Sequence, residues 1–96
     1  MIDHEKNLRK AIELSKQSID SGSSPFGCVI VDAEGKIVGE GHNRVAPDND
    51  PTAHGEVVAI RNACRNLGTF DLSGCILYTS CEPCPMCLNA CKWANI

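Results

Sequence analysis

A cluster of cysteines is the feature that most constrains how this chain of 96 residues can fold. The chain contains 7 cysteines, and between Cys81 and Cys91 one recurs at every third or fourth position. In a reducing compartment, clustered cysteines indicate metal or redox chemistry more often than a disulfide framework. A chain of this length buries a modest hydrophobic core, which a metal site or a partner subunit would stabilise. The cluster therefore favours a small fold that contains a metal or redox site.

Composition and charge narrow the class of protein. Hydrophobic residues make up 43% and charged residues 22% of the chain, as in an ordinary globular domain, and we expect one domain over residues 1–96. The net charge of -3 and the aromatic content of 4% argue against a nucleic acid as the main ligand. No apolar run approaches the length of a membrane span, and the first residues do not resemble a secretory leader. We therefore expect a cytoplasmic protein that does not associate with membranes.

The first half of the chain has the pattern of one helix followed by two strands. A helix is expected from about Asp3 to Ser21, because apolar and small residues recur at helical spacing. The residues of this stripe are Leu8, Ala11, Ile12, Ser15 and Ile19. Two strands are expected at residues 26–32 and 37–41, joined by a hairpin turn. Residues 41–50 are polar and rich in turn formers, which predicts a loop.

The second half of the chain predicts a helix, a strand and a further helix. Asp50 and Pro51 are typical of a helix start, and Gly68 is typical of a helix end. The apolar stripe of this helix consists of Ala53, Val57, Ile60, Cys64 and Leu67. A strand is expected over residues 72–79, and Pro85 should begin a last helix that continues past Cys91.

This order of elements, α-β-β-α-β-α, predicts an α/β fold with three layers: helix, mixed sheet and helix. The first two strands should form an antiparallel hairpin. The third strand follows a helical crossover, so we expect it to be parallel to one of the first two. It would lie at an open edge of the sheet unless another segment covers it.

Two short motifs carry the chemistry, and each lies at the expected start of a helix. They are His54-Gly55-Glu56 and Cys84-Pro85-Met86-Cys87. Cys84 and Cys87 can face one point from the first helical turn, where free N–H groups stabilise thiolates. His54 offers a third ligand, and three protein ligands plus a water molecule are typical of a catalytic zinc site. Glu56 is poorly spaced for a fourth ligand, so it should point at the water and act as general acid and base.

Each of these residues also has an interpretation without catalysis. Alone, His54 would be a partly exposed polar residue, and Glu56 would be a solvated charge on a helix. Cys84 and Cys87 alone could form a redox pair. A structural zinc site could use the four clustered cysteines, Cys81, Cys84, Cys87 and Cys91, although such sites usually take ligand pairs from separate segments. The other three cysteines lie on apolar stripes or strands and are expected in the core: Cys28, Cys64 and Cys75.

Taken together, the two motifs resemble those of zinc-dependent nucleobase deaminases, in which H-x-E is followed by P-C-x-x-C. The surrounding residues are similar to the cytidine/deoxycytidylate deaminase-like family over nearly the whole chain. The stretches that carry the resemblance are residues 25–31, 41–43, 50–56 and 79–87. Within that family, residues 75–88 and Trp93 most resemble the bacterial guanine deaminase branch. The tRNA adenosine deaminases share much of the same pattern.

The resemblance implies a zinc cofactor and a role for each matching residue. His54, Cys84 and Cys87 match the three zinc ligands of the family. Glu56 matches its proton shuttle. Asn43 matches an amide that binds the edge of the base, and Phe26 matches an apolar wall beside the base. Trp93 matches an aromatic position near the pocket. The implied reaction is hydrolytic deamination of a small nucleobase or nucleoside, with guanine to xanthine plus ammonia favoured.

Other substrates and one other class of function remain open. A tRNA adenosine or cytosine-type substrate would use the same motifs, although the acidic balance of the chain argues against tRNA. From another class, the chain could be a non-catalytic zinc-binding assembly module, which would not need Glu56. Gly55 replaces the alanine that is commoner in the family, which should loosen the helix start. Family members continue past the last helix, so we expect a fold truncated before the later strands that associates as a homodimer.

Overall fold

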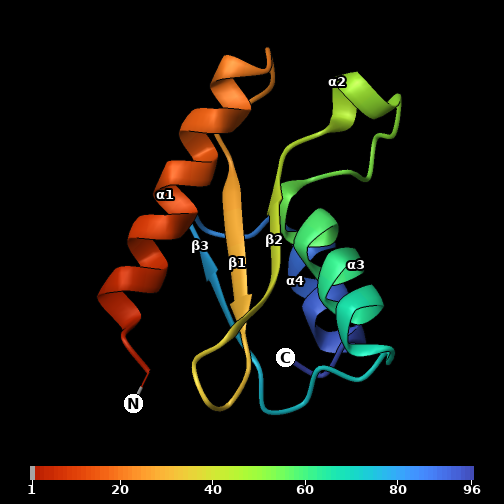
Figure 1. Cartoon of the computed structure of the whole chain (residues 1–96). Helices are drawn as coiled ribbons and strands as arrows, with labels where there is room; N and C mark the ends of the chain where they lie inside the picture. The colour runs from red at the N-terminus through yellow and green to blue at the C-terminus, as the bar shows by residue number, and fades with distance from the viewer. Residues whose placement is uncertain (1) are drawn as a thin grey trace.

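One long helix lies on one face of a three-stranded sheet, and two shorter helices lie on the other face (Figure 1). The computed structural model describes residues 2–96. In chain order the elements are α1 (His4–Asp20), β1 (Gly27–Val31), β2 (Ile37–His42), α2 (Val45–Asp48), α3 (Gly55–Leu67), β3 (Ile76–Thr79) and α4 (Pro85–Trp93). The predicted order is confirmed, and α2 is an added short helix within the expected loop. Within residues 2–96, no helix combines the length and the apolar character needed to cross a membrane.

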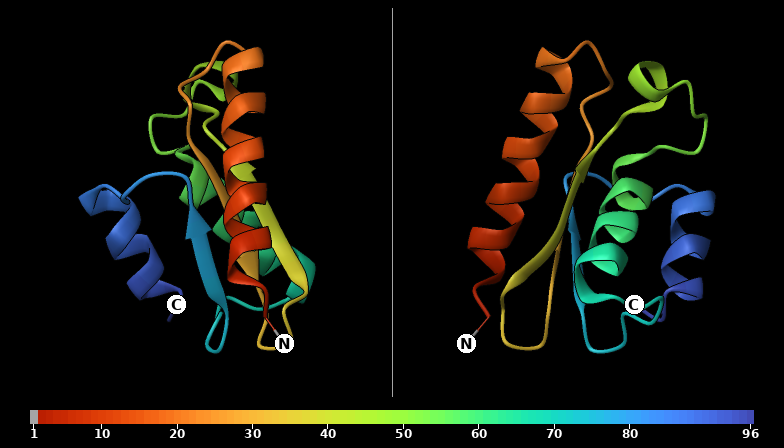
Figure 2. Two further views of the ribbon diagram at one scale, coloured as in Figure 1. Left: turned by 90° about the vertical axis from the view of Figure 1, so that its left-hand side faces the viewer. Right: turned by 45° about the vertical axis from the view of Figure 1, so that its right-hand side comes forward.

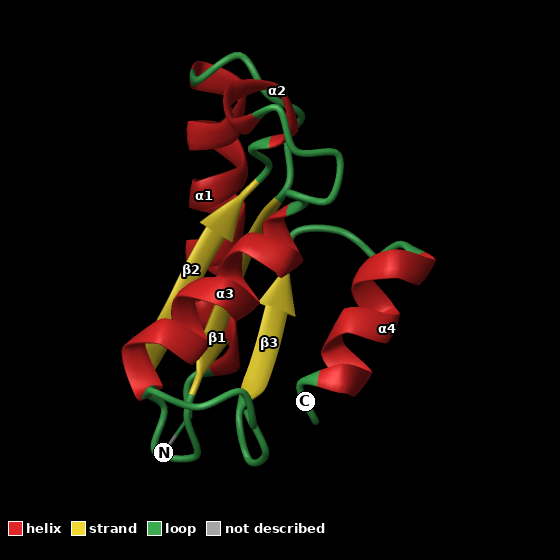
Figure 3. Cartoon of the chain, turned by 90° about the vertical axis from the view of Figure 1, so that its right-hand side faces the viewer, coloured by secondary structure: helices red, strands yellow, loops and turns green. Residues whose placement is uncertain are grey.

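The strands are paired in the order β2-β1-β3, with β1 in the centre (Figure 3). Both pairings are antiparallel. From Cys28 to Val31 along β1, the opposite residues run backwards from Gly41 to Ile37 in β2 and from Thr79 to Ile76 in β3. The predicted fold class is confirmed, but the mixed sheet is wrong for the described strands. β3 does run in the same direction as β2. The connection through α3 passes across β1, so β3 pairs with β1 on the side opposite to β2. β3 therefore has no parallel neighbour.

The core is built on both faces of β1, because all five residues of this strand are buried. Successive side chains belong to two different hydrophobic clusters, as the alternation of a strand requires. Cys28 and Ile30 pack on the side of α3, whereas Val29 and Val31 pack under α1. The three cysteines predicted in the core lie in the first cluster or against it: Cys28, Cys64 and Cys75.

α3 lies close against β2 and is held there by two amide side chains. A Cβ atom at Gly39 would lie 2.6 Å from a backbone oxygen of α3, so a glycine is needed for this approach. Asn62 donates a 2.8 Å hydrogen bond to the carbonyl oxygen of Glu40, and Asn66 donates one of 2.8 Å to that of Val38. These bonds satisfy carbonyl groups of an edge strand and fix α3 along it.

α1 rests on the sheet through a face that differs from the predicted one. Its buried residues are Asn7, Ala11, Leu14 and Ser18. Of the larger apolar residues in the predicted stripe, three are exposed instead: Leu8, Ile12 and Ile19. The two backbones approach so closely that a Cβ atom at Gly27 would lie 2.8 Å from the Cβ of Leu14. The contact face therefore combines small residues, Ala11 and Ser18, with Leu14, whereas Leu8, Ile12 and Ile19 are turned outward.

The start of α3 differs from the prediction, whereas its end does not. The helix begins at Gly55 rather than at Asp50, because the intervening residues form turns. Gly68 follows the helix with a φ of 66°, in the left-handed region that favours glycine at a helix end.

β3 is shorter than the predicted strand, because residues 72–75 form a turn in which the N–H of Cys75 donates a 3.0 Å hydrogen bond to the carbonyl oxygen of Leu72. The strand begins at Ile76 rather than at Leu72. The backbone N–H of Leu72 donates a 2.8 Å hydrogen bond to the carbonyl oxygen of Ala94, directly after α4. This contact holds the end of α4 beside the sheet, next to α3 (Figure 2). The starts of α3 and α4 are thereby brought to the same region of the molecule.

Candidate metal centre

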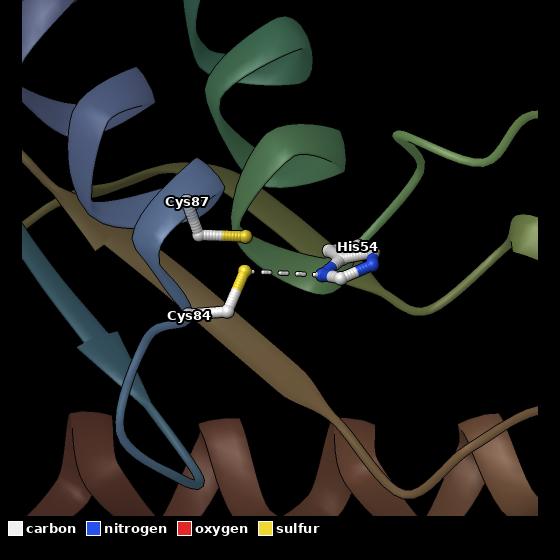
Figure 4. Close-up of side chains that lie close together, drawn as sticks. All are labelled: His54, Cys84 and Cys87. Carbon is white, nitrogen blue, oxygen red and sulfur yellow. Dashed lines mark hydrogen bonds between the residues drawn. The ribbon is translucent and has the colours of Figure 1, made fainter.

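Three side chains from the two helix starts meet at one point (Figure 4). The ligand atoms of His54, Cys84 and Cys87 all lie within 4.8 Å of one another. The Nδ1 atom of His54 is 3.6 Å from the Sγ atom of Cys84. Cys87 is buried, and the other two side chains are partly buried. One imidazole nitrogen and two thiol sulfurs form a donor set that zinc prefers, so the group fits a zinc ion.

The local backbone explains why these side chains face each other. His54 is the residue before α3 and Cys84 is the residue before α4, each with extended backbone angles. The His54 side chain makes no capping hydrogen bond to its own helix, so it remains available to the shared point. Pro85 occupies the first turn of α4, where its missing N–H costs nothing.

The two thiols of the cluster have opposite tendencies to ionise. The backbone N–H of Cys87 lowers the pKa of the Cys84 thiol, with the N–H of Met86 contributing. Burial strongly raises the pKa of the Cys87 thiol, and the neighbouring Cys84 and Glu56 raise it further. A pair of thiolates at this distance therefore needs a cation between them, and a bound metal ion deprotonates its thiol ligands.

Glu56 lies beside the cluster as the second residue of α3, and only 5% of its surface is exposed. Its charge raises the pKa of Cys87 and also that of Cys28, for which burial is the larger cause. No carboxylate among residues 2–96 belongs to the group of mutually close ligand atoms. A buried carboxylate therefore borders the cluster without completing it.

The alternative site of four cysteines is not formed among residues 2–96. Cys81 is exposed, and its thiol contacts the carbonyl oxygen of Glu82 at 3.8 Å. Cys91 is buried one turn beyond Cys87 in α4. Both sulfurs lie outside the group formed with His54.

Asn43 and Phe26 are brought together near the start of α3. The backbone N–H of Asn43 donates a 3.1 Å hydrogen bond to the carbonyl oxygen of Phe26. A Cβ atom at Gly55 would lie 3.3 Å from that same oxygen, so α3 begins against this pair. The Oδ1 atom of the buried Asn43 accepts a 3.1 Å hydrogen bond from the N–H of Val45, which leaves its amide hydrogens directed elsewhere.

Trp93 is not brought to the cluster. It is the last residue of α4, whereas Cys84 directly precedes the helix. At a rise of about 1.5 Å per residue, the two are separated by roughly 13 Å along the helix axis. Its surface is 87% exposed, so it does not lie in the core formed by the described residues.

One set of residues near the centre is absent from the sequence prediction. Asp50, Thr52 and Arg61 are connected by hydrogen bonds next to His54. Asp50 followed by Pro51 predicts a helix start, but an Asp followed two positions later by a hydroxyl residue is also typical of a side-chain-to-backbone turn. That signal would have identified the turn.

Comparison with known proteins agrees with this geometry. The protein-family model described as the cytidine and deoxycytidylate deaminase zinc-binding region matches residues 1–96 of the sequence. The chain belongs to this deaminase family. Its predicted fold and zinc cofactor are therefore confirmed at the level of the family, and the His and Cys cluster fits the zinc site.

Several family members are similar over most of this chain. Guanine deaminase from Bacillus subtilis (strain 168) is 54% identical over 95 residues, which are 98% of this chain and 60% of the relative. The tRNA-specific adenosine deaminase of Aquifex aeolicus (strain VF5) is 46% identical over 83 residues, or 86% of this chain and 54% of the relative. The X-ray structure of the Bacillus subtilis guanine deaminase superposes with a TM-score of 0.92, covering 97% of this chain and 59% of that one. This deaminase chain therefore spans little more than half of these relatives.

Proposed function

We propose that residues 1–96 form the part of a deaminase domain that contains its catalytic centre. The reaction is the zinc-dependent hydrolytic deamination of a small nucleobase or nucleoside, with guanine converted to xanthine and ammonia. The observation that carries the proposal is the meeting of two helix starts at one imidazole and two thiols, with the buried Glu56 beside them. A purely structural metal site would not need that carboxylate.

In this proposal His54, Cys84 and Cys87 hold the zinc ion. When bound, zinc supplies a water molecule that ionises near neutral pH and so becomes a nucleophile. The free N–H groups at the starts of α3 and α4 offset the negative charge of the two thiolates. Cys84, with its lowered pKa, is the thiol best prepared to bind the ion.

Glu56 is the proposed general base and acid. It takes a proton from the attacking water and delivers it to a nitrogen of the ring. It then passes the second proton of that water to the amino group, which leaves as ammonia. Because Glu56 is buried next to the cluster, its carboxylate is held within reach of both steps.

Asn43 and Phe26 are the proposed substrate contacts. The amide N–H groups of Asn43 can donate to acceptors at the edge of a base, since its Oδ1 is already used by Val45. Phe26 directly precedes β1 and is 37% exposed, so its ring can cover the face of the base. A substrate contact by Trp93 stays a prediction, because that residue lies at the other end of α4.

Guanine is favoured over the other substrates on two grounds. The guanine deaminase relative is 54% identical to this chain, whereas the Aquifex aeolicus tRNA-specific adenosine deaminase is 46% and a probable cytosine deaminase of Schizosaccharomyces pombe is 45% identical. The net charge of -3 also disfavours a polynucleotide. A mass-spectrometric screen of guanine, guanosine, adenine, cytosine and cytidine tests the choice, and deamination of cytosine or adenine in place of guanine would overturn it.

We further propose that the protein is a cytoplasmic homodimer. Several large apolar side chains are exposed on α1 and on α4, and such surface favours association between copies of a chain. They are Leu8, Ile12 and Ile19 on α1, and Met86, Leu88 and Trp93 on α4. Light scattering at micromolar concentration tests the dimer, and a monomer at that concentration would contradict it.

A further inference from the structure

The turn that precedes α3 is tied to the outer side of that helix by side chains. The Oδ1 atom of Asp50 accepts hydrogen bonds from the N–H of Thr52 at 2.9 Å and from its hydroxyl at 2.6 Å. The Oδ2 atom of Asp50 accepts a 3.0 Å bond from Arg61, whose guanidinium also donates to the Thr52 hydroxyl at 3.3 Å. We refer to Asp50, Thr52 and Arg61 as the Asp50 clamp.

The Asp50 clamp continues directly into the backbone of His54. The N–H of Ala53 donates to the carbonyl oxygen of Asp50 at 3.1 Å, and the N–H of His54 donates to that of Thr52 at 2.8 Å. On the other side, the carbonyl oxygen of His54 accepts a 2.9 Å bond from the N–H of Val58 in α3. The backbone of His54 is therefore held between the turn and the helix, and Arg61 joins the same two elements from outside.

The imidazole ring of His54 has little other support. Histidines that bind metals usually donate their second ring N–H to a carboxylate or carbonyl, which fixes the ring. Among residues 2–96, the only hydrogen-bond contact of the His54 ring is the one between Nδ1 and Cys84, inside the cluster itself. The direction of the ring must therefore follow from the position of the His54 backbone.

We propose that the Asp50 clamp positions His54 and thereby sets the affinity of the centre for zinc. This inference rests on the proposed function, because it assigns a role toward the proposed ion. Asp50, Thr52 and Arg61 are positioning residues, since they act on the metal only through the backbone of His54. The salt bridge between Asp50 and Arg61 is partly exposed, with side-chain exposures of 30% and 47%, so it adds little to overall stability. Loss of outer support for a metal ligand, by contrast, typically lowers metal affinity about 10- to 100-fold.

The same segment offers a matched control for this proposal. Arg44 donates to Asp48 at 2.9 and 3.0 Å, in a salt bridge that is similarly exposed but closes only on α2. The test uses Asp50→Asn and Arg61→Gln against the controls Asp48→Asn and Arg44→Gln. Zinc affinity is measured by competition with a chromophoric chelator, and thermal unfolding of the zinc-free proteins shows that each variant is folded. The absorption spectrum of the cobalt-loaded proteins reports the geometry of the ligands.

We expect both clamp variants to lose about tenfold or more in zinc affinity and to alter the cobalt spectrum. Both control variants should keep the affinity and spectrum of the parent, and all four should unfold at similar temperatures without metal. Parent-like zinc affinity in Asp50→Asn and Arg61→Gln would overturn the inference, as would equal losses in the control variants. If the parent chain itself binds no zinc, the proposed function fails and the inference fails with it, which is a separate outcome.

Discussion

The Nδ1 atom of His54 lies 3.6 Å from the Sγ atom of Cys84, although the two residues are 30 positions apart in the chain. Each directly precedes a helix, and α3 and α4 lie side by side on one face of the sheet (Figure 2). A metal ion bound at this point would cross-link the two helix starts. Binding of the metal should therefore be coupled to the stability of the fold.

Removal of zinc should lower the thermal stability of the protein. A ligand at about 100 times its Kd stabilises the folded state by about 2.7 kcal/mol. In a domain of this size, that corresponds to a decrease in Tm of roughly 10 °C or more when a chelator removes the ion. Calorimetry with and without chelator measures the shift, and zinc added back in excess should restore the original Tm. An unchanged Tm in a protein shown to have lost its zinc would contradict the coupling.

Replacement of Glu56 by glutamine should separate catalysis from metal binding. The variant should keep its zinc and its Tm, because Glu56 lies beside the cluster and not within it. Turnover should fall by about 10²–10⁴-fold, the usual loss for a general acid and base. The comparison needs a form of the protein that deaminates guanine measurably, and Glu34→Gln in the exposed turn before β2 is the control. Parent-like turnover in Glu56→Gln would refute the mechanism, and loss of zinc would make Glu56 a ligand.

The two amide side chains that hold α3 against β2 should contribute measurably to stability. Asn62→Ala or Asn66→Ala removes a 2.8 Å hydrogen bond and leaves a carbonyl group of β2 without that donor. Each change should lower the free energy of unfolding by about 1 kcal/mol. Asn89→Ala, at an exposed position of α4, is the matched control and should have almost no effect. Denaturant unfolding decides the matter, and equal stability of all three variants would count against this packing.

The start of α4 and the cluster of His54, Cys84 and Cys87 could be predicted from the sequence, because their signals are local. A proline after Cys84 and a spacing of three to Cys87 are enough to place two sulfurs on one helical turn. The pairing of β3 with β1 could not be predicted in the same way. A crossover fixes the direction of the returning strand but not the edge of the sheet to which it is added.

The buried face of α1 was also beyond a sequence prediction. Periodicity marks Leu8 and Ile12 as readily as it marks Leu14, and it contains no information about the distance between helix and sheet. That distance is set by Gly27 on β1, a residue that the helical pattern does not include. The turn at Asp50 could not be predicted for a different reason: Asp followed by Pro is also typical of a helix start.

The Asp50 clamp should make the stability of the zinc-free protein depend on pH in the acid range. Hydrogen bonds from Thr52 and then from Arg61 lower the pKa of Asp50 from 3.8 to about 2. A lowered pKa in the folded state means that the stabilisation is fully present above the unfolded value and is lost as pH falls toward 2. Because Asp50 is partly exposed, the stability difference between the zinc-free parent and Asp50→Asn should be small. It should be constant above about pH 5 and should vanish near the pKa of the folded state. Thermal unfolding in chelator from neutral to acid pH measures it, and a difference that grows on acidification would have the wrong sign.

The metal content of two cysteine variants tests the central claim most directly. Cys87→Ser removes a member of the cluster, whereas Cys81→Ser removes an exposed thiol from the same segment. After dialysis against trace zinc, elemental analysis should find one zinc ion per chain in the parent and in Cys81→Ser, and far less in Cys87→Ser. The parent loaded with cobalt should show absorption from two bound thiolates, and Cys81→Ser should keep this absorption. Zinc retained by Cys87→Ser and lost from Cys81→Ser would contradict the assignment of the centre to His54, Cys84 and Cys87.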